Sequence, residues 1–167
     1  KRDLLLPESQ RKLMEAIAET GKPVVLCLMA GSDIDLSYAA EHFDAVLQLW
    51  YPGSEGGKAA AQVLFGEVSP SGKLPVTFYE SLEELPEFTD YRMEGRTYRY
   101  MKGKAQYPFG YGLTYGNVSV TGAEIAARPD GSIVVSAEAE NTGVETDEVL
   151  QVHVENTDCG RAGKHPE

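Results

Sequence analysis

Two short, uninterrupted apolar runs, residues 23–29 and 45–50, most constrain how this 167-residue chain folds. Runs of this length, bounded by turn residues, are typical of strands buried on both faces of a parallel sheet. Helical patterns flank them, from Pro7 to Gly21, over residues 33–41 and over residues 54–65. This alternation predicts right-handed crossovers and an α/β layer with a largely parallel sheet. Two strands are few for an independent sheet, so we expect the second half of a larger layer.

The hydrophobic period changes to two after residue 116. Alternating apolar and polar side chains predict further strands, and turn residues separate them, at residues 118–120, 133–139 and 149–154 with turns at 129–131 and 141–143. This pattern is typical of the start of a β-sandwich, although three strands are fewer than the roughly seven of an immunoglobulin-like domain. We therefore expect an α/β domain over residues 1–115 and a partial β-sandwich over residues 116–167, ending in a polar loop at 159–167.

The segment between the two regular regions is rich in turn residues, arginines and tyrosines. A short strand is predicted at residues 74–78 and a loop at 82–86. Arg92, Arg96 and Arg99 are interleaved with tyrosines, as in a nucleic-acid patch, but acidic residues stand among them. We therefore expect guanidinium groups stacked on tyrosines or paired with carboxylates across an interface, with contact to a substrate as the alternative role.

Charge and cysteine usage narrow the classes of partner. A formal net charge of −11 argues against nucleic acid and against anionic membranes, and no apolar run approaches the roughly 18–20 residues that span a bilayer. The scattered histidines give no metal-ligand spacing, and no cofactor is expected. Cys27 and Cys159 form no disulfide framework, which favours the reducing cytoplasm, while a secreted or periplasmic location stays open. Cys27 is predicted to be a small buried hydrophobe. Neither an initiator Met nor a signal-peptide pattern is present at Lys1, so targeting information is expected outside these residues.

A glycine-rich turn, Trp50-Tyr51-Pro52-Gly53-Ser54-Glu55-Gly56-Gly57, connects the second apolar run to an alanine-rich helix. Such a turn lies at the carboxyl edge of a parallel sheet, where ligands bind in open α/β folds. Its carboxylate and two aromatic rings suit a neutral, polyhydroxylated ligand. Glu55 and Tyr51 are the predicted substrate-binding residues, with helix stabilisation as the alternative role of Glu55. Trp50 is predicted to pack in the core.

Two other functions compete with saccharide binding at this turn. A nucleotide-binding module would need a converging Lys or Arg and the GxxxxGK[ST] order, which is absent, and Glu55 would repel phosphate. A non-catalytic interaction domain would use the aromatic segment at residues 107–115 as its docking surface. This alternative stays open.

Six ordered motifs resemble glycoside hydrolase family 3. They are Leu6-Pro7-x-x-Gln10, Gly21-Lys22-Pro23-Val24-Val25, Trp50-x-Pro52-Gly53-x-Glu55-Gly56-Gly57, Val63-Leu64-Phe65-Gly66, the run from Pro70 to Phe78 and the run from Tyr107 to Leu113. Residues 141–143 and 149–152 resemble the fibronectin-III-like domain that follows in many members.

This resemblance implies a retaining exo-β-glycosidase that removes terminal β-D-glucosyl or β-D-xylosyl residues from small saccharides. Such enzymes use two carboxylates about 5 Å apart, a nucleophile and a general acid/base. In the family the nucleophilic Asp belongs to a separate barrel domain, and the acid/base Glu would fall upstream of Lys1. We therefore predict no catalytic residue within this chain, no activity of the chain by itself, and a barrel domain of the same protein as its partner.

Overall fold

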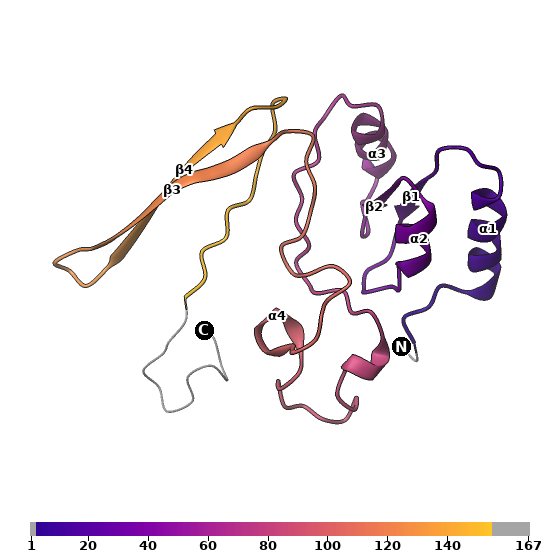
Figure 1. Cartoon of the computed structure of the whole chain (residues 1–167), viewed down its shortest axis with the longest axis horizontal. Coiled ribbons are helices and arrows are strands. Elements are labelled where there is room, and N and C mark those ends of the chain that lie inside the picture. The colour runs from indigo at the N-terminus through magenta and orange to yellow at the C-terminus, as the bar shows by residue number, and fades with distance from the viewer. Residues whose placement is uncertain (1–2, 155–167) are drawn as a thin grey trace. The chain divides into compact units, whose positions relative to one another are not determined.

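The computed structural model describes residues 3–154 and separates them into two compact units. The first unit comprises residues 3–61, 74–111 and 151–154, and the second comprises residues 62–73 and 112–150. Figure 1 shows the chain passing through the helices and strands of the first part before it reaches the long hairpin of β3 and β4.

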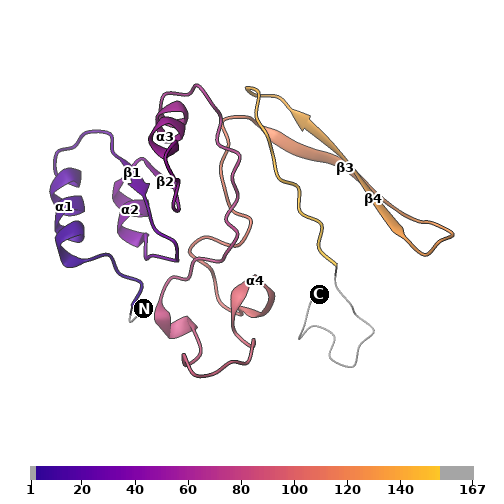
Figure 2. The ribbon, with the colours of Figure 1, turned by 180° about the vertical axis from the view of Figure 1, so that it is seen from behind.

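The first unit contains the predicted parallel pair of strands. β1 (Val25–Leu28) and β2 (Ala45–Gln48) pair in parallel from Val25↔Ala45 to Leu28↔Gln48, and α2 (Ser37–His42) connects them. In Figure 2 α2 lies beside this pair, in agreement with its contacts to β2. α1 (Glu8–Ala18) precedes them and α3 (Gly56–Leu64) follows. The α/β fold class with a parallel sheet is confirmed.

An aromatic centre holds the first unit together. Phe78 is 1% exposed and lies in a cluster with Leu28, Ile34 and Leu36. The rings of Trp50 and Tyr107 pack against Phe78 edge-on, with centroids 6.3 and 6.4 Å from its own. The predicted core role of Trp50 is therefore confirmed, and it fixes the start of the glycine-rich turn.

The prediction that both strands are buried on both faces is wrong. Leu26 and Leu28 face the core cluster, whereas Val25 and Cys27 alternate with them and are exposed. In β2, Ala45 is exposed and Val46, Leu47 and Gln48 are only partly buried. Cys27 is consequently a surface thiol and not the buried hydrophobe predicted from its apolar neighbours.

The second unit is built on an antiparallel hairpin. β3 (Val118–Ala127) pairs with β4 (Ile133–Asn141), with an irregularity between Val120 and Gly122. The predicted turn at 129–131 is confirmed: Gly131 has φ of +83° and Asp130 accepts the Ser132 N–H at 2.9 Å. The hairpin agrees with the period-two pattern, while the fibronectin-III-like sandwich stays a prediction.

Three local predictions in irregular segments are wrong. Residues 149–154 form no strand, because no described strand pairs with them. Residues 74–78 make one isolated bridge, Phe78↔Tyr107, in place of a strand. The predicted loop at 82–86 contains a short 3-10 helix, η1 (Leu82–Glu84), whose first turn is capped by the hydroxyl of Ser81. The predicted polar loop at 159–167 lies outside the described residues.

Candidate functional site

The glycine-rich turn leaves β2 at the carboxyl edge of the parallel pair, as predicted. Trp50 adopts a left-handed φ of +54°, which is uncommon for a residue with a side chain, and Gly53 has φ of +68°. Gly56 begins α3 and donates its N–H to the carbonyl of Gly53 at 3.3 Å. A Cβ at Gly56 would lie 2.5 Å from the Pro52 ring, so only glycine fits here. The turn is therefore tightly folded, which holds the flanking side chains in place.

Tyr51 lies in this turn and is 80% exposed. One edge of its ring lies against Gly31, in the loop after β1, so closely that a Cβ at Gly31 would overlap the ring. The loops that follow the two parallel strands therefore meet at one edge. This contact was not predicted, because it joins glycine and tyrosine across 20 residues of sequence.

Glu55 lies one residue before α3, with a side chain that is 80% exposed. Its carboxylate is 4.0 Å from the Lys58 ammonium, and its carbonyl accepts the Ala59 N–H at 3.0 Å. Such a long and exposed ion pair stabilises little and restrains the carboxylate little. Glu55 can therefore reach a ligand that arrives from solvent at this edge.

Two polar side chains near the turn make hydrogen bonds that hold the loops at this edge of the sheet. The Gln48 amide donates to the carbonyl of Ala30 at 2.7 Å, which ties the end of β2 to the loop after β1. The Asp33 carboxylate accepts the N–H of Tyr79 at 2.9 Å. Sequence reasoning missed both residues; a polar side chain at the end of an apolar strand is the signal that could have found Gln48.

The aromatic segment at 107–115 is largely used for internal packing. Tyr107 packs on Phe78 and on Tyr111, with a centroid distance of 5.1 Å to the latter, and burial raises the pKa of the Tyr107 phenol. Phe109 stacks on Tyr98 with centroids 4.2 Å apart and planes inclined by 17°. Tyr107 and Phe109 are therefore engaged in packing within the first unit, which leaves fewer rings of this segment for the docking surface considered above.

A cavity of about 520 Å³ lies beside α4 (Thr97–Tyr100). Its lining is mostly apolar and aromatic, from Pro75, Val76, Thr77, Tyr79, Met93, Thr97, Tyr98, Arg99, Tyr100 and Phe109. Thr97 has φ of +57°, which is strained for a β-branched residue, and its N–H donates to the Tyr79 hydroxyl at 2.6 Å. The guanidinium of Arg99 lies 5.8 Å from the centre of the Tyr98 ring and donates to its hydroxyl, so the predicted arginine–tyrosine stacking is confirmed there.

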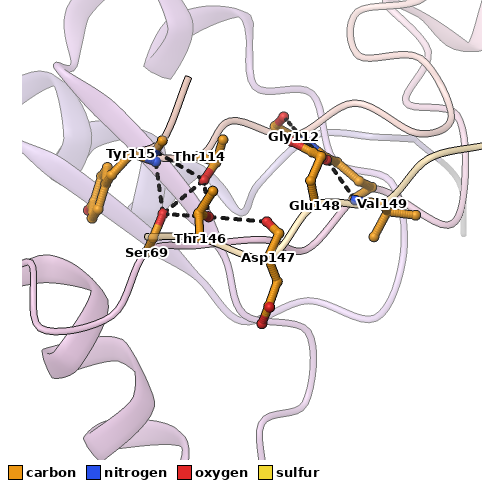
Figure 3. Close-up of polar contacts among 10 residues, drawn as sticks. Ser69, Gly112, Thr114, Tyr115, Thr146, Asp147, Glu148 and Val149 are labelled. Carbon is orange, nitrogen blue, oxygen red and sulfur yellow. Dashed lines mark hydrogen bonds and ion pairs between the residues drawn. The ribbon is translucent and has the colours of Figure 1, made fainter. Parts of the chain in front are cut away.

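A polar cluster organises the second unit, where no site was predicted. The hydroxyls of Ser69, Thr114 and Thr146 hydrogen-bond to one another, and the N–H of Tyr115 donates to Ser69 at 2.9 Å (Figure 3). Beside them the ammonium of Lys73 donates to the carboxylate of Glu148 at 3.1 Å and to the carbonyl of Gly112 at 2.7 Å. A Cβ at Gly112 would overlap the backbone carbonyl of Gly72, so glycine is required there. This cluster ties residues 144–148 to segments far away in sequence.

Neither a membrane-spanning helix nor a metal cluster is found within residues 3–154. No helix in that range combines the length and the apolar character that a bilayer crossing requires. In the same range no three His, Cys, Asp or Glu side chains gather closely enough to hold a metal ion.

A parallel α/β unit with a glycine-rich turn at the carboxyl edge of its sheet is the kind of domain that binds ligands at that edge. The model of the glycosyl hydrolase family 3 C-terminal domain matches residues 1–115, and the chain belongs to this family. The resemblance noted from the sequence motifs is thereby confirmed.

Curated relatives and solved structures agree with this assignment. A xylan 1,4-beta-xylosidase from Xylanibacter ruminicola is 44% identical and is matched over 90% of this chain and 18% of its own length. A periplasmic beta-glucosidase from Salmonella typhimurium is 36% identical, over 92% of this chain and 22% of its own length. The structure of beta-glucosidase 3B from Thermotoga neapolitana in complex with alpha-D-glucose superposes with a TM-score of 0.72 at 29% identity, covering 86% of this chain and 23% of that chain. The chain thus spans about a fifth of the length of these relatives.

Proposed function

We propose that these residues are part of a retaining exo-β-glycosidase that hydrolyses terminal β-D-xylosyl or β-D-glucosyl residues of small saccharides. The observation that carries the proposal is the match over 90% of the chain, at 44% identity, to a relative named as a xylan 1,4-beta-xylosidase. Other relatives are named as beta-glucosidases, so both sugars stay within the proposal.

Within that enzyme the chain has an accessory role. Retaining hydrolysis needs a nucleophile and an acid/base carboxylate about 5–5.5 Å apart. We assign neither to this chain and place the nucleophile on a barrel domain of the same protein, which is the chain's proposed partner. We further propose that residues 1–115 belong to the α/β domain and that a fibronectin-III-like β-sandwich begins at residue 116.

Tyr51 and Glu55 are the residues through which the chain contributes to the saccharide site. The ring of Tyr51 is exposed and backed by Gly31, so it offers a supported flat face to the C–H groups of a sugar ring. The carboxylate of Glu55 is exposed and weakly restrained, so it can accept hydrogen bonds from sugar hydroxyls. That a relative of this fold is solved with glucose supports a saccharide as the ligand.

Hydrolysis of nitrophenyl β-D-xyloside and nitrophenyl β-D-glucoside tests this proposal. We expect release of nitrophenol by the longer protein that contains these residues, and no release by the 167-residue chain alone. The ratio of kcat/KM for the two substrates then identifies the preferred sugar. A longer protein that hydrolyses neither substrate, or a chain that hydrolyses one by itself, would contradict the proposal.

A further inference from the structure

A loop at residues 86–94 exposes two aromatic rings to solvent. Phe88 is 86% exposed and Tyr91 is 88% exposed, so neither side chain contributes appreciably to the packing of the first unit. Exposed aromatic residues of this size are costly in water and are characteristic of binding surfaces.

The backbone of this loop is nevertheless held in place by polar contacts. The guanidinium of Arg96 is half-buried and donates to the carbonyls of Glu87 at 3.0 Å and of Asp90 at 2.8 Å, with a longer contact of 3.5 Å to Pro86. One side chain therefore contacts three backbone carbonyls of the loop. We refer to this set of contacts as the Arg96 clamp.

Two tight turns complete the restraint. The N–H of Asp90 donates to the Glu87 carbonyl at 2.9 Å, which places Phe88 at the tip of the first turn. A second turn closes where the N–H of Arg96 donates to Met93 at 3.0 Å, and its Gly95 supplies the required φ of +76°. Because the loop is ordered by its own polar groups, little conformational entropy remains to be lost when the two rings bind a ligand.

The charges beside the rings indicate the chemistry of that ligand. Glu87 and Glu94 are exposed on the same loop, with Glu94 3.4 Å from the exposed ammonium of Lys102, and the Asp90 carboxylate is already engaged by Arg92 through contacts of 2.6–3.2 Å. A polyanion would be repelled by these carboxylates and by the net charge of −11. Flat aromatic faces next to hydrogen-bond acceptors suit a neutral chain with many hydroxyl groups.

We propose that the loop at residues 86–94 binds a β-linked saccharide chain through the rings of Phe88 and Tyr91. The choice of β-linked sugars rests on the proposed function, whereas the exposure of the rings and the polar contacts of the loop are independent of it. The rings bind apolar C–H faces of the sugar, and Glu87 and Glu94 accept hydrogen bonds from its hydroxyls.

Titration of the 167-residue chain with xylotetraose and cellotetraose, followed by calorimetry, tests this binding. We expect at least one of them to bind, and Phe88→Ala and Tyr91→Ala each to weaken binding by about 3- to 10-fold, the equivalent of one lost aromatic contact. Phe65→Ala is the matched control, because Phe65 is 83% exposed elsewhere on the chain, and it should leave the affinity unchanged. Absence of binding to both sugars, equal weakening by the control, or equal affinity for the α-linked maltotetraose would overturn the proposal.

Arg96→Lys tests the role of the clamp separately from the rings. A lysine keeps the charge, but its ammonium ends one bond short of the position of Nη2, the atom of Arg96 that contacts all three carbonyls. We therefore expect faster amide hydrogen exchange over residues 86–94 and a 2- to 5-fold weaker affinity with both rings still present. Unchanged exchange and affinity would contradict the role of Arg96 as a positioning residue. This binding assay is independent of nitrophenyl glycoside hydrolysis: loss of binding with intact hydrolysis refutes only the loop proposal, and the reverse result refutes only the proposed function.

Discussion

Removing the ammonium group of Lys73 should loosen the second unit. The Lys73 side chain is 13% exposed and that of Glu148 is 18% exposed, with Nζ 2.8 Å from one carboxylate oxygen and 3.1 Å from the other. The same ammonium donates to the carbonyl of Gly112 at 2.7 Å. Lys73→Met keeps most of the apolar stem but leaves both acceptors without this donor.

The magnitude follows from the partial burial of the pair. An exposed ion pair contributes about 0.2–1 kcal/mol, and removing one partner of a fully buried pair costs about 3–5 kcal/mol. Because both side chains are mostly covered, we expect Lys73→Met to lower the free energy of unfolding by about 2–3 kcal/mol. Glu148→Gln keeps an acceptor for the ammonium and should cost about 1–2 kcal/mol. The double variant should cost less than the sum.

The assay is urea denaturation combined with hydrogen exchange over residues 144–150. Lys58→Met is the matched control, because Lys58 is 71% exposed and 4.0 Å from Glu55, so its loss should cost under about 0.5 kcal/mol.

The hydrogen bond from Lys73, followed by that from the Val149 N–H, holds the pKa of Glu148 below its usual range. Its stabilisation is therefore complete above about pH 5 and is lost as the pH falls through the lowered pKa. A cost for Lys73→Met no larger than for Lys58→Met, or one that does not shrink in acid, would refute this reasoning.

Three further predictions follow from the same contacts. Phe78→Ala should destabilise the first unit by about 3–5 kcal/mol, measured by urea denaturation, because it empties the aromatic centre. Gly112→Ala should cost about 1–3 kcal/mol in the same assay, since its Cβ would overlap the backbone carbonyl of Gly72; an unchanged midpoint would contradict that close approach. The hydrogen bond from Arg92 lowers the pKa of Asp90 to about 2, so protection of residues 86–94 from hydrogen exchange should persist above about pH 4 and fall as the pH approaches 2, and Asp90→Asn should abolish this pH dependence.

The elements were predictable wherever the pattern was local. The two apolar runs predicted the parallel pair, and the period of two predicted β3 and β4, because burial on one face or two faces leaves a signature within a few residues. The exposure of Val25 and Cys27 in β1 was not predictable, because burial of that face depends on residues that lie elsewhere in sequence. Residues 149–154 show the converse case: their alternation suits a strand, but strand formation depends on a partner that the described chain does not supply.

The candidate site was likewise predictable only in part. The glycine-rich turn and the core position of Trp50 were predicted, because conformational demands and apolar neighbours are visible in the sequence. The contact of Tyr51 with Gly31 and the ion pair of Lys73 with Glu148, 75 residues apart, depend on the folded chain. The Arg96 clamp was missed because Arg96 binds backbone carbonyls, and the sequence does not show which carbonyls a side chain reaches in the folded chain.

The steady-state kinetics of Glu55→Gln in the longer protein test the central claim most directly. If the glycine-rich turn forms a wall of the saccharide site and carries no reacting carboxylate, KM for the preferred nitrophenyl glycoside should rise about 3- to 10-fold while kcat stays within about threefold. Tyr51→Ala should give the same pattern, and Lys58→Met should change neither constant. A loss of kcat of about a thousandfold or more in Glu55→Gln would make Glu55 a catalytic residue and contradict the account, as would unchanged constants in both variants.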